Sequence, residues 1–197
     1  MKHVIELEDG DAAVLRETGS GGLIGRGLLH DDPLGEYLGT DEQPKYVVRN
    51  KRGGFSVERT GTDGTSTEAV ADPDPDGDHS AAALVTDTRV LFAVGRSEGD
   101  RTRSVPLADV VDVHVTDGFL GGEIVFETVE DERYRFPSRG ELAPVREFVD
   151  AAAGIWARAE RQLESAEDRL DRTERAFESG DVDVVLAAVG EIRETLE

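Results

Sequence analysis

AALVTDTRVLFAV, at residues 82–94, is the stretch that decides the fold predicted for this chain. Its aliphatic first half leads into a polar turn at Asp87-Thr88, and an apolar run then carries the chain back, as in a β-hairpin. Further short apolar runs follow at residues 104–107, 110–115, 123–129 and 133–136, separated by glycine, aspartate or charged turns. This spacing predicts an all-β barrel or sandwich.

Two more strands are predicted on the N-terminal side, at residues 45–50 and 55–59, joined as a hairpin by the turn at residues 51–54. Residues 28–43 are predicted to form a short helix across the β-structure, with Pro33 in its first turn. The glycine-rich residues 19–27 match neither the G-x-G-x-x-G spacing nor a P-loop, so they predict a linker.

After residue 138 the apolar period changes from 2 to 3.6, which predicts a helix. Ser138 and Glu141 are placed as a capping box, and the apolar stripe then continues as a coiled-coil seam. Residues of this seam at seven-residue spacing are Trp156, Leu163, Leu170 and Phe177. Gly180 and Asp181 predict the end of this helix and the start of a last one. The seam pairs either within one chain, as a helical hairpin, or with a second chain.

The charge balance of the chain is strongly acidic. Its 197 residues include 43 acidic and 22 basic ones, for a net charge of -21, yet 38% are hydrophobic, as expected of a folded protein. Lysine is rare beside arginine, a composition typical of proteins that stay soluble in molar salt. The absence of a broad basic face argues against a nucleic-acid partner.

Cysteine is absent, so disulfides and thiolate metal sites are excluded. No apolar run has the length of a signal peptide or a membrane span, which predicts a cytoplasmic protein, soluble or peripheral at the inner face of the membrane. Asp72, Asp74, Asp76 and Gly77 match the first half of a calcium loop, but Ala83 stands where the bidentate glutamate belongs. An acidic surface loop is therefore predicted.

Catalytic and metal-binding constellations are not evident in the sequence. His3, His30, His79 and His114 lack ligand spacing, and no Ser, His and Asp set stands out. The sequence therefore predicts no enzyme activity, no cofactor and no metal.

The hairpin and the strand after it resemble the prokaryotic pleckstrin-homology-like (PH-like) family, which is related in fold to GRAM domains. The similarity covers residues 34–155, and its main motifs are ALVTDTRVLF at residues 83–92 and VPLADVVDV at residues 105–113. Residues 118–126 are similar to the next hairpin, residues 141–155 to the closing helix, and residues 34–44 to the lead-in segment of haloarchaeal members. Membership implies a mainly β α+β fold: a curved barrel or sandwich capped by a helix.

The resemblance implies a binding platform for lipid headgroups or protein segments, with no enzyme activity. Thr86, Asp87 and Arg89 are expected to shape the turn, with the Arg89 fork on carbonyls or a carboxylate. Basic residues in and beside the first hairpin of eukaryotic PH relatives hold phosphates. The corresponding cluster here is Lys45, Arg49, Lys51, Arg52 and Arg59.

Three segments are predicted: an N-terminal extension at residues 1–33, a PH-like domain at 34–155, and a helical hairpin or coiled coil at 156–197. We expect a non-catalytic interaction or scaffold protein, with a protein partner or self-association through its C-terminal helices. The alternative is a peripheral module that binds anionic headgroups through the basic cluster.

Overall fold

The structure of the chain is a computed structural model that describes residues 4–7, 12–16, 28–50, 53–60, 67–71, 74–77, 79–116, 121–179 and 186. The chain divides into two compact units, Met1–Trp156 and Ala157–Glu197. The first unit contains all the described strands.

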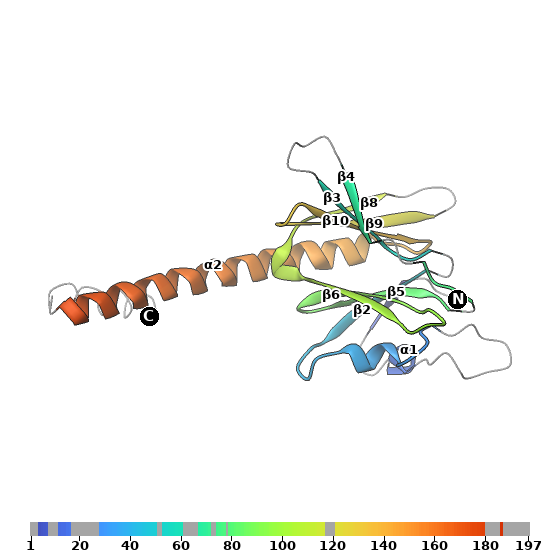
Figure 1. Ribbon diagram of the computed structural model, residues 1–197, viewed down its shortest axis with the longest axis horizontal. Helices are drawn as coiled ribbons and strands as arrows, with labels where there is room; N and C mark the ends of the chain where they lie inside the picture. The colour runs from blue at the N-terminus through green and yellow to red at the C-terminus, as the bar shows by residue number, and fades with distance from the viewer. Residues whose placement is uncertain are drawn as a thin grey trace. The chain divides into compact units, whose positions relative to one another are not determined.

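Two five-stranded antiparallel sheets make up the first unit (Figure 1). Sheet A has the order β1 (Val4–Glu6), β2 (Pro44–Asn50), β5 (Ala81–Thr86), β6 (Arg89–Val94) and β7 (Arg101–Pro106). Sheet B has the order β4 (Thr67–Ala71), β3 (Ser56–Thr60), β10 (Glu132–Ser138), β9 (Gly122–Thr128) and β8 (Val110–Thr116). The prediction of a mainly β fold is confirmed, although the two sheets of the described chain do not close into a barrel.

The predicted hairpin of residues 45–50 and 55–59 is wrong. Strand β2 pairs with β1 and β5, whereas β3 pairs with β4 and β10. The chain crosses from sheet A to sheet B between Asn50 and Ser56, so two strands adjacent in sequence lie in different layers. Strand β4 was not predicted, because it lies between the predicted strand at residues 55–59 and the predicted hairpin at residues 82–94.

The central strands of sheet A, β2, β5 and β6, are buried on both faces, and this explains the unbroken apolar run in β5. Residues such as Ala83, Val85 and Phe92 face the main core between the sheets. Their neighbours Leu84 and Leu91 face a second cluster, on the opposite side. A strand buried on both faces reads as continuously apolar, because neither set of alternating side chains meets water.

A covering layer lies on the outer face of sheet A. It includes Leu28, Leu29 and Leu34, which are buried, and it is partly built from helix α1 (Ala12–Leu15) and the 3₁₀ helix η1 (Leu34–Tyr37). Pro33 is the residue just before η1. The layer approaches β6 so closely that a Cβ atom on Gly95 would stand 2.8 Å from the Leu28 carbonyl oxygen.

Helix α2 (Ala143–Ser179) follows β10, and its first turns pack into the main core through Val145, Val149 and Ala153. The predicted capping box is wrong: Ser138 is the buried last residue of β10. The first helical hydrogen bond instead runs from the Arg146 N–H to the Leu142 carbonyl. Pro144 fits the first turn because a proline there loses no intrahelical hydrogen bond. A short 3₁₀ helix, η2 (Leu107–Asp109), joins β7 to β8.

The second unit contains the rest of α2 and a helical residue, Leu186. The predicted helix boundary at Gly180 and Asp181 lies outside the described residues, as do the other members of the predicted last helix. Residues 19–27 of the predicted glycine-rich linker also lie outside them.

Candidate functional site

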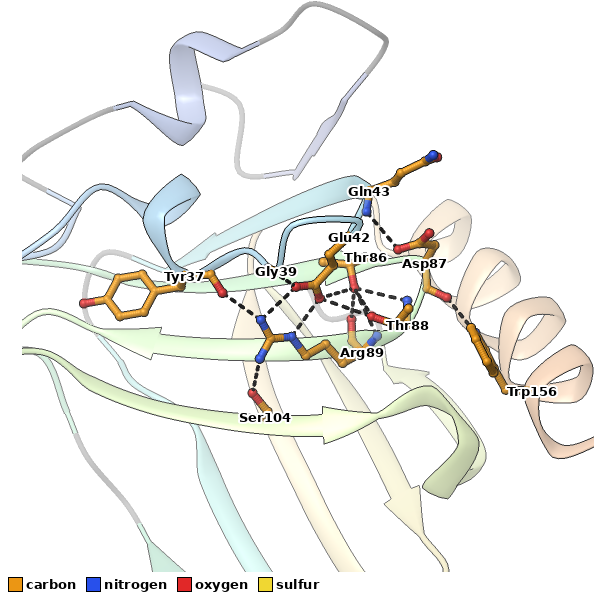
Figure 2. A network of polar contacts seen from close by, with 10 residues as sticks. All are labelled: Tyr37, Gly39, Glu42, Gln43, Thr86, Asp87, Thr88, Arg89, Ser104 and Trp156. Carbon is orange, nitrogen blue, oxygen red and sulfur yellow. Dashed lines mark hydrogen bonds and ion pairs between the residues drawn. The ribbon is translucent and has the colours of Figure 1, made fainter. Parts of the chain in front are cut away.

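The β5–β6 turn carries the motif that the sequence singled out, and the structure places it at the centre of a polar network (Figure 2). The Thr86 hydroxyl oxygen accepts hydrogen bonds from the N–H groups of Thr88 and Arg89, at 3.2 and 3.0 Å. A Ser or Thr side chain that bonds its own turn in this way replaces part of a backbone ladder. The motif therefore sets the geometry of the turn.

Arg89 joins two other segments, the lead-in segment before β2 and strand β7, to that turn. Its Nε and Nη2 atoms bind the two carboxylate oxygens of Glu42 at 2.7 and 2.8 Å, a bidentate pair. Nη2 also donates to the Tyr37 carbonyl at 2.7 Å, and Nη1 donates to the Ser104 hydroxyl at 2.9 Å. Figure 2 shows the guanidinium surrounded by these partners. All of these partners of the guanidinium lie within the protein, and we call the bidentate pair the Glu42–Arg89 clamp.

Glu42 is the acceptor at the centre of the network. Burial alone would raise its pKa, but hydrogen bonds from Arg89, the Gly39 N–H and Thr86 outweigh burial and lower the pKa from 4.5 to about 2. Its carboxylate is therefore held in the charged form by the surrounding donors.

Asp87 connects the same turn to two further elements. Its carboxylate accepts the Gln43 N–H at 2.9 Å, and its own N–H donates to the Gln43 carbonyl at 3.0 Å. The indole Nε1 of Trp156 donates to the Asp87 carbonyl at 2.7 Å. The turn thus attaches the lead-in segment before β2 and helix α2 to one point of sheet A.

A second charged cluster lies around Glu132, which is buried on β10. Its carboxylate binds the guanidinium of Arg59, the Tyr134 hydroxyl at 2.5 Å and Arg103 Nη2 at 3.3 Å. Burial raises the pKa of Glu132. The hydrogen bonds from Tyr134 and Arg59 and the charge of Arg103 lower this pKa by more than burial raises it, so the net shift is downward. The cluster joins β7 of sheet A to β3 and β10 of sheet B.

The structure does not bring the described members of the predicted basic cluster together as one exposed patch. Arg49 is only 6% exposed on β2, Arg59 on β3 is bound to Glu132, and Lys45 donates to the side chain of Gln43 at 3.1 Å. Lys51 and Arg52 lie outside the described residues. Two other arginines on nearby segments also have acidic partners, because Arg96 lies 3.8 Å from Asp76 and Arg103 binds Glu132.

The described carboxylates of the acidic loop bind protein N–H groups. Asp74 accepts the Gly54 N–H at 2.9 Å, and Asp76 accepts the Ser97 N–H at 2.5 Å. The two carboxylates bind different segments, so this part of the loop is hydrogen-bonded to the chain around Gly54 and around Ser97. No helix within the described residues has the length and apolar character needed to cross a membrane.

Glu42 and Glu132 were missed in the sequence. A signal for Glu132 existed, because it stands at an inward position of the period-2 pattern that continues with Tyr134 and Phe136. For Glu42 there was no such signal, since it lies in a polar lead-in segment 47 positions before its partner Arg89.

The predicted helix seam is exposed in its second half. Leu163, Leu170 and Phe177 are 61%, 60% and 76% exposed. Trp156 belongs to the first unit, where its indole is bound to Asp87.

Comparison with known proteins agrees with the fold. The family profile described as "Bacterial PH domain" matches residues 38–153, which is more than half of the chain. The chain belongs to this bacterial PH domain family. The PH domain thus includes both sheets from β2 onward, the Glu42–Arg89 clamp and the core-packed start of α2. PH domains are modules for protein or lipid interaction.

Two solved structures are similar to this chain at low identity. The N-terminal PH domain of Vps36 is 14% identical, with a TM-score of 0.42, over 70% of this chain and 89% of that one. The PH domain of USP37 is 13% identical, with a TM-score of 0.35, over 52% of this chain and 94% of that one. No curated protein sequence matches the chain significantly.

Proposed function

We propose that this protein is a non-catalytic interaction protein of the cytoplasm, in which a PH domain binds a protein segment and the C-terminal helix self-associates. The observation that carries the proposal is the exposed apolar seam of α2, formed by Leu163, Leu170 and Phe177. Large apolar side chains at heptad spacing stay mostly exposed on a single helix. When two such helices pair, these side chains form a continuous buried stripe.

The charges beside the seam favour a second copy in parallel orientation. With Leu163 and Leu170 at heptad position a, the e positions are Glu160, Glu167 and Glu174. An antiparallel pair would set these glutamates against one another, whereas a parallel pair sets them against the g positions, Gln162 and Arg169. Electrostatic repulsion is therefore lower in the parallel dimer.

Light scattering of the full chain in molar KCl tests self-association. We expect the wild type to be a dimer or higher oligomer, and the double variant Leu163→Glu, Leu170→Glu to be a monomer. Val129→Glu is the matched control, because Val129 is also 61% exposed but lies outside the seam. A wild-type monomer, or a Val129→Glu variant that dissociates equally, would contradict the proposal.

A protein segment is favoured over a lipid headgroup as the ligand of the PH domain. Arg49 is buried, and the charge of Arg59 is offset by Glu132, so these two offer little to a phosphate. The alternative, peripheral binding at the inner face of the membrane, then depends mainly on Lys51 and Arg52. Flotation with anionic vesicles separates the two functions: equal recovery of the wild type and of Lys51→Glu, Arg52→Glu supports the protein segment. Selective loss of the variant supports the membrane.

A further inference from the structure

The outward face of β8 and β9 brings together three side chains that could ligate a metal ion: Asp112, His114 and Glu127. Asp112 and His114 are two residues apart on β8, and Glu127 stands opposite Asp112 in the register with β9. None of these residues belongs to the Glu42–Arg89 clamp or the Glu132 cluster.

A β-bulge places the two β8 residues on this face. The register shifts between Val110 and Asp112, and Val111 is the extra residue. Val110 and Val113 are both buried, whereas Asp112 and His114 are exposed. If side chains alternated regularly through Val111, with no bulge, Asp112 and His114 would share the inward face with Val110.

The donor atoms are already close to one another. His114 Nε2 lies 3.2 Å from Asp112 Oδ2 and 3.9 Å from Glu127 Oε1, and all three donors fall within 4.8 Å. A cation about 2.1 Å from its ligands brings neighbouring donors to about 3.0–3.5 Å from one another. Small side-chain rotations are enough to reach that geometry.

The charges of the cluster are also incompletely balanced. Asp112 and Glu127 are carboxylates directly opposite each other, an arrangement that destabilises a strand pair. Arg133 on β10 offsets part of this repulsion, with its Nε 2.9 Å from Glu127 Oε1. The second oxygen of Asp112 accepts the Val113 N–H at 2.7 Å, which leaves Oδ2 directed toward His114.

We propose that Asp112, His114 and Glu127 form a binding site for a divalent transition-metal ion such as Zn²⁺, Co²⁺ or Ni²⁺. One imidazole and two carboxylates suit these ions, whereas Mg²⁺ and Ca²⁺ prefer oxygen ligands alone. Water completes the coordination, because the site faces solvent. Arg133 competes with the metal for Glu127.

Calorimetric titration of the metal-free full-length protein with Zn²⁺ in molar KCl tests the site. We expect one class of site in the wild type, and binding weaker by about tenfold or more in His114→Ala and in Asp112→Asn. Arg133→Gln should bind about two- to fivefold more tightly, because a competing cation is removed. Unchanged binding by His114→Ala, or weaker binding by Arg133→Gln, would overturn the proposal.

His30→Ala is the matched control. His30 is 43% exposed beside Asp31, and His114 is 54% exposed beside Asp112, so both are exposed histidines next to an aspartate. Oxygens of Asp31 and Asp100 near His30 accept backbone N–H groups. We expect His30→Ala to bind Zn²⁺ like the wild type. Loss of binding equal to that of His114→Ala would mean unspecific binding and reject the site.

A readout without substitution uses the histidine imidazole signals in NMR spectra. Substoichiometric Ni²⁺ should broaden the His114 signal first, while the signals of His30 and His79 stay sharp. Equal broadening of all three would reject the site.

Discussion

At the residue scale, the side chains of the turn motif bind partners that lie far away in sequence. Thr86 shapes the turn, Asp87 binds Gln43, and Arg89 binds Glu42. The resemblance to a known family pointed to Asp87 and Arg89, whereas only the fold identified their partners Gln43 and Glu42. Among these residues, Glu42 should make a contribution to stability that depends on pH, because its pKa is lowered from 4.5 to about 2.

Glu42→Gln is expected to destabilise the protein by about 2–3 kcal/mol at neutral pH, since it leaves Arg89 without its bidentate partner. The pKa of Glu42 is lower in the folded state than its ordinary 4.5, so its stabilisation is full above that pH and is lost as pH falls toward about 2. Urea unfolding of both proteins should show the difference narrowing between pH 6 and 3. A constant difference over that range would contradict the assignment.

At the element scale, strands and helix differ in how closely other segments approach them. The covering layer touches the end of β6 at Gly95, whereas nothing lies within 4 Å of a Cβ atom on Gly154 in α2. The same substitution should therefore have opposite effects at the two positions.

Gly95→Ala is expected to destabilise the protein by about 1–3 kcal/mol, because the new methyl group overlaps the Leu28 carbonyl and the backbone of Leu29. Gly154→Ala is the matched control and should stabilise by about 0.5–1 kcal/mol through helix propensity. Thermal unfolding of both variants measures the two effects. Destabilisation by both, or by neither, would show that the covering layer does not pack on β6 in this way.

At the scale of the whole molecule, the net charge of -21 is the dominant property. Ion pairs such as Glu42–Arg89 and Glu132–Arg59 cannot balance this charge, because the chain has 43 acidic side chains and only 22 basic ones. The other carboxylates repel one another over a distance that depends on the salt concentration.

We expect the free energy of unfolding to rise steadily between low and molar KCl. The Debye length falls from about 10 Å at 0.1 M to about 3 Å at 1 M, so repulsion within the compact state is progressively screened. Urea unfolding at a series of KCl concentrations measures the effect. A denaturation midpoint independent of salt would mean that the acidic surface contributes little to stability.

The sequence by itself determined the mainly β fold, the position of most strands and the long helix. Those properties depend on local periodicity, and residues 82–94 carry it in an unbroken form. The failures were local signals overruled by packing: Ser138 looked like a helix cap but is buried in β10, and residues 45–59 looked like a hairpin but cross between sheets.

Only the tertiary structure decided which polar side chains act together. Arg49 lies in a basic run in the sequence, yet its side chain is buried. The Glu132 carboxylate binds two arginines that come from different sheets. Asp112 meets Glu127 because strand register pairs residues without regard to their spacing in the chain. Periodicity reports which face a residue is on, whereas its neighbours on that face depend on pairing between distant segments.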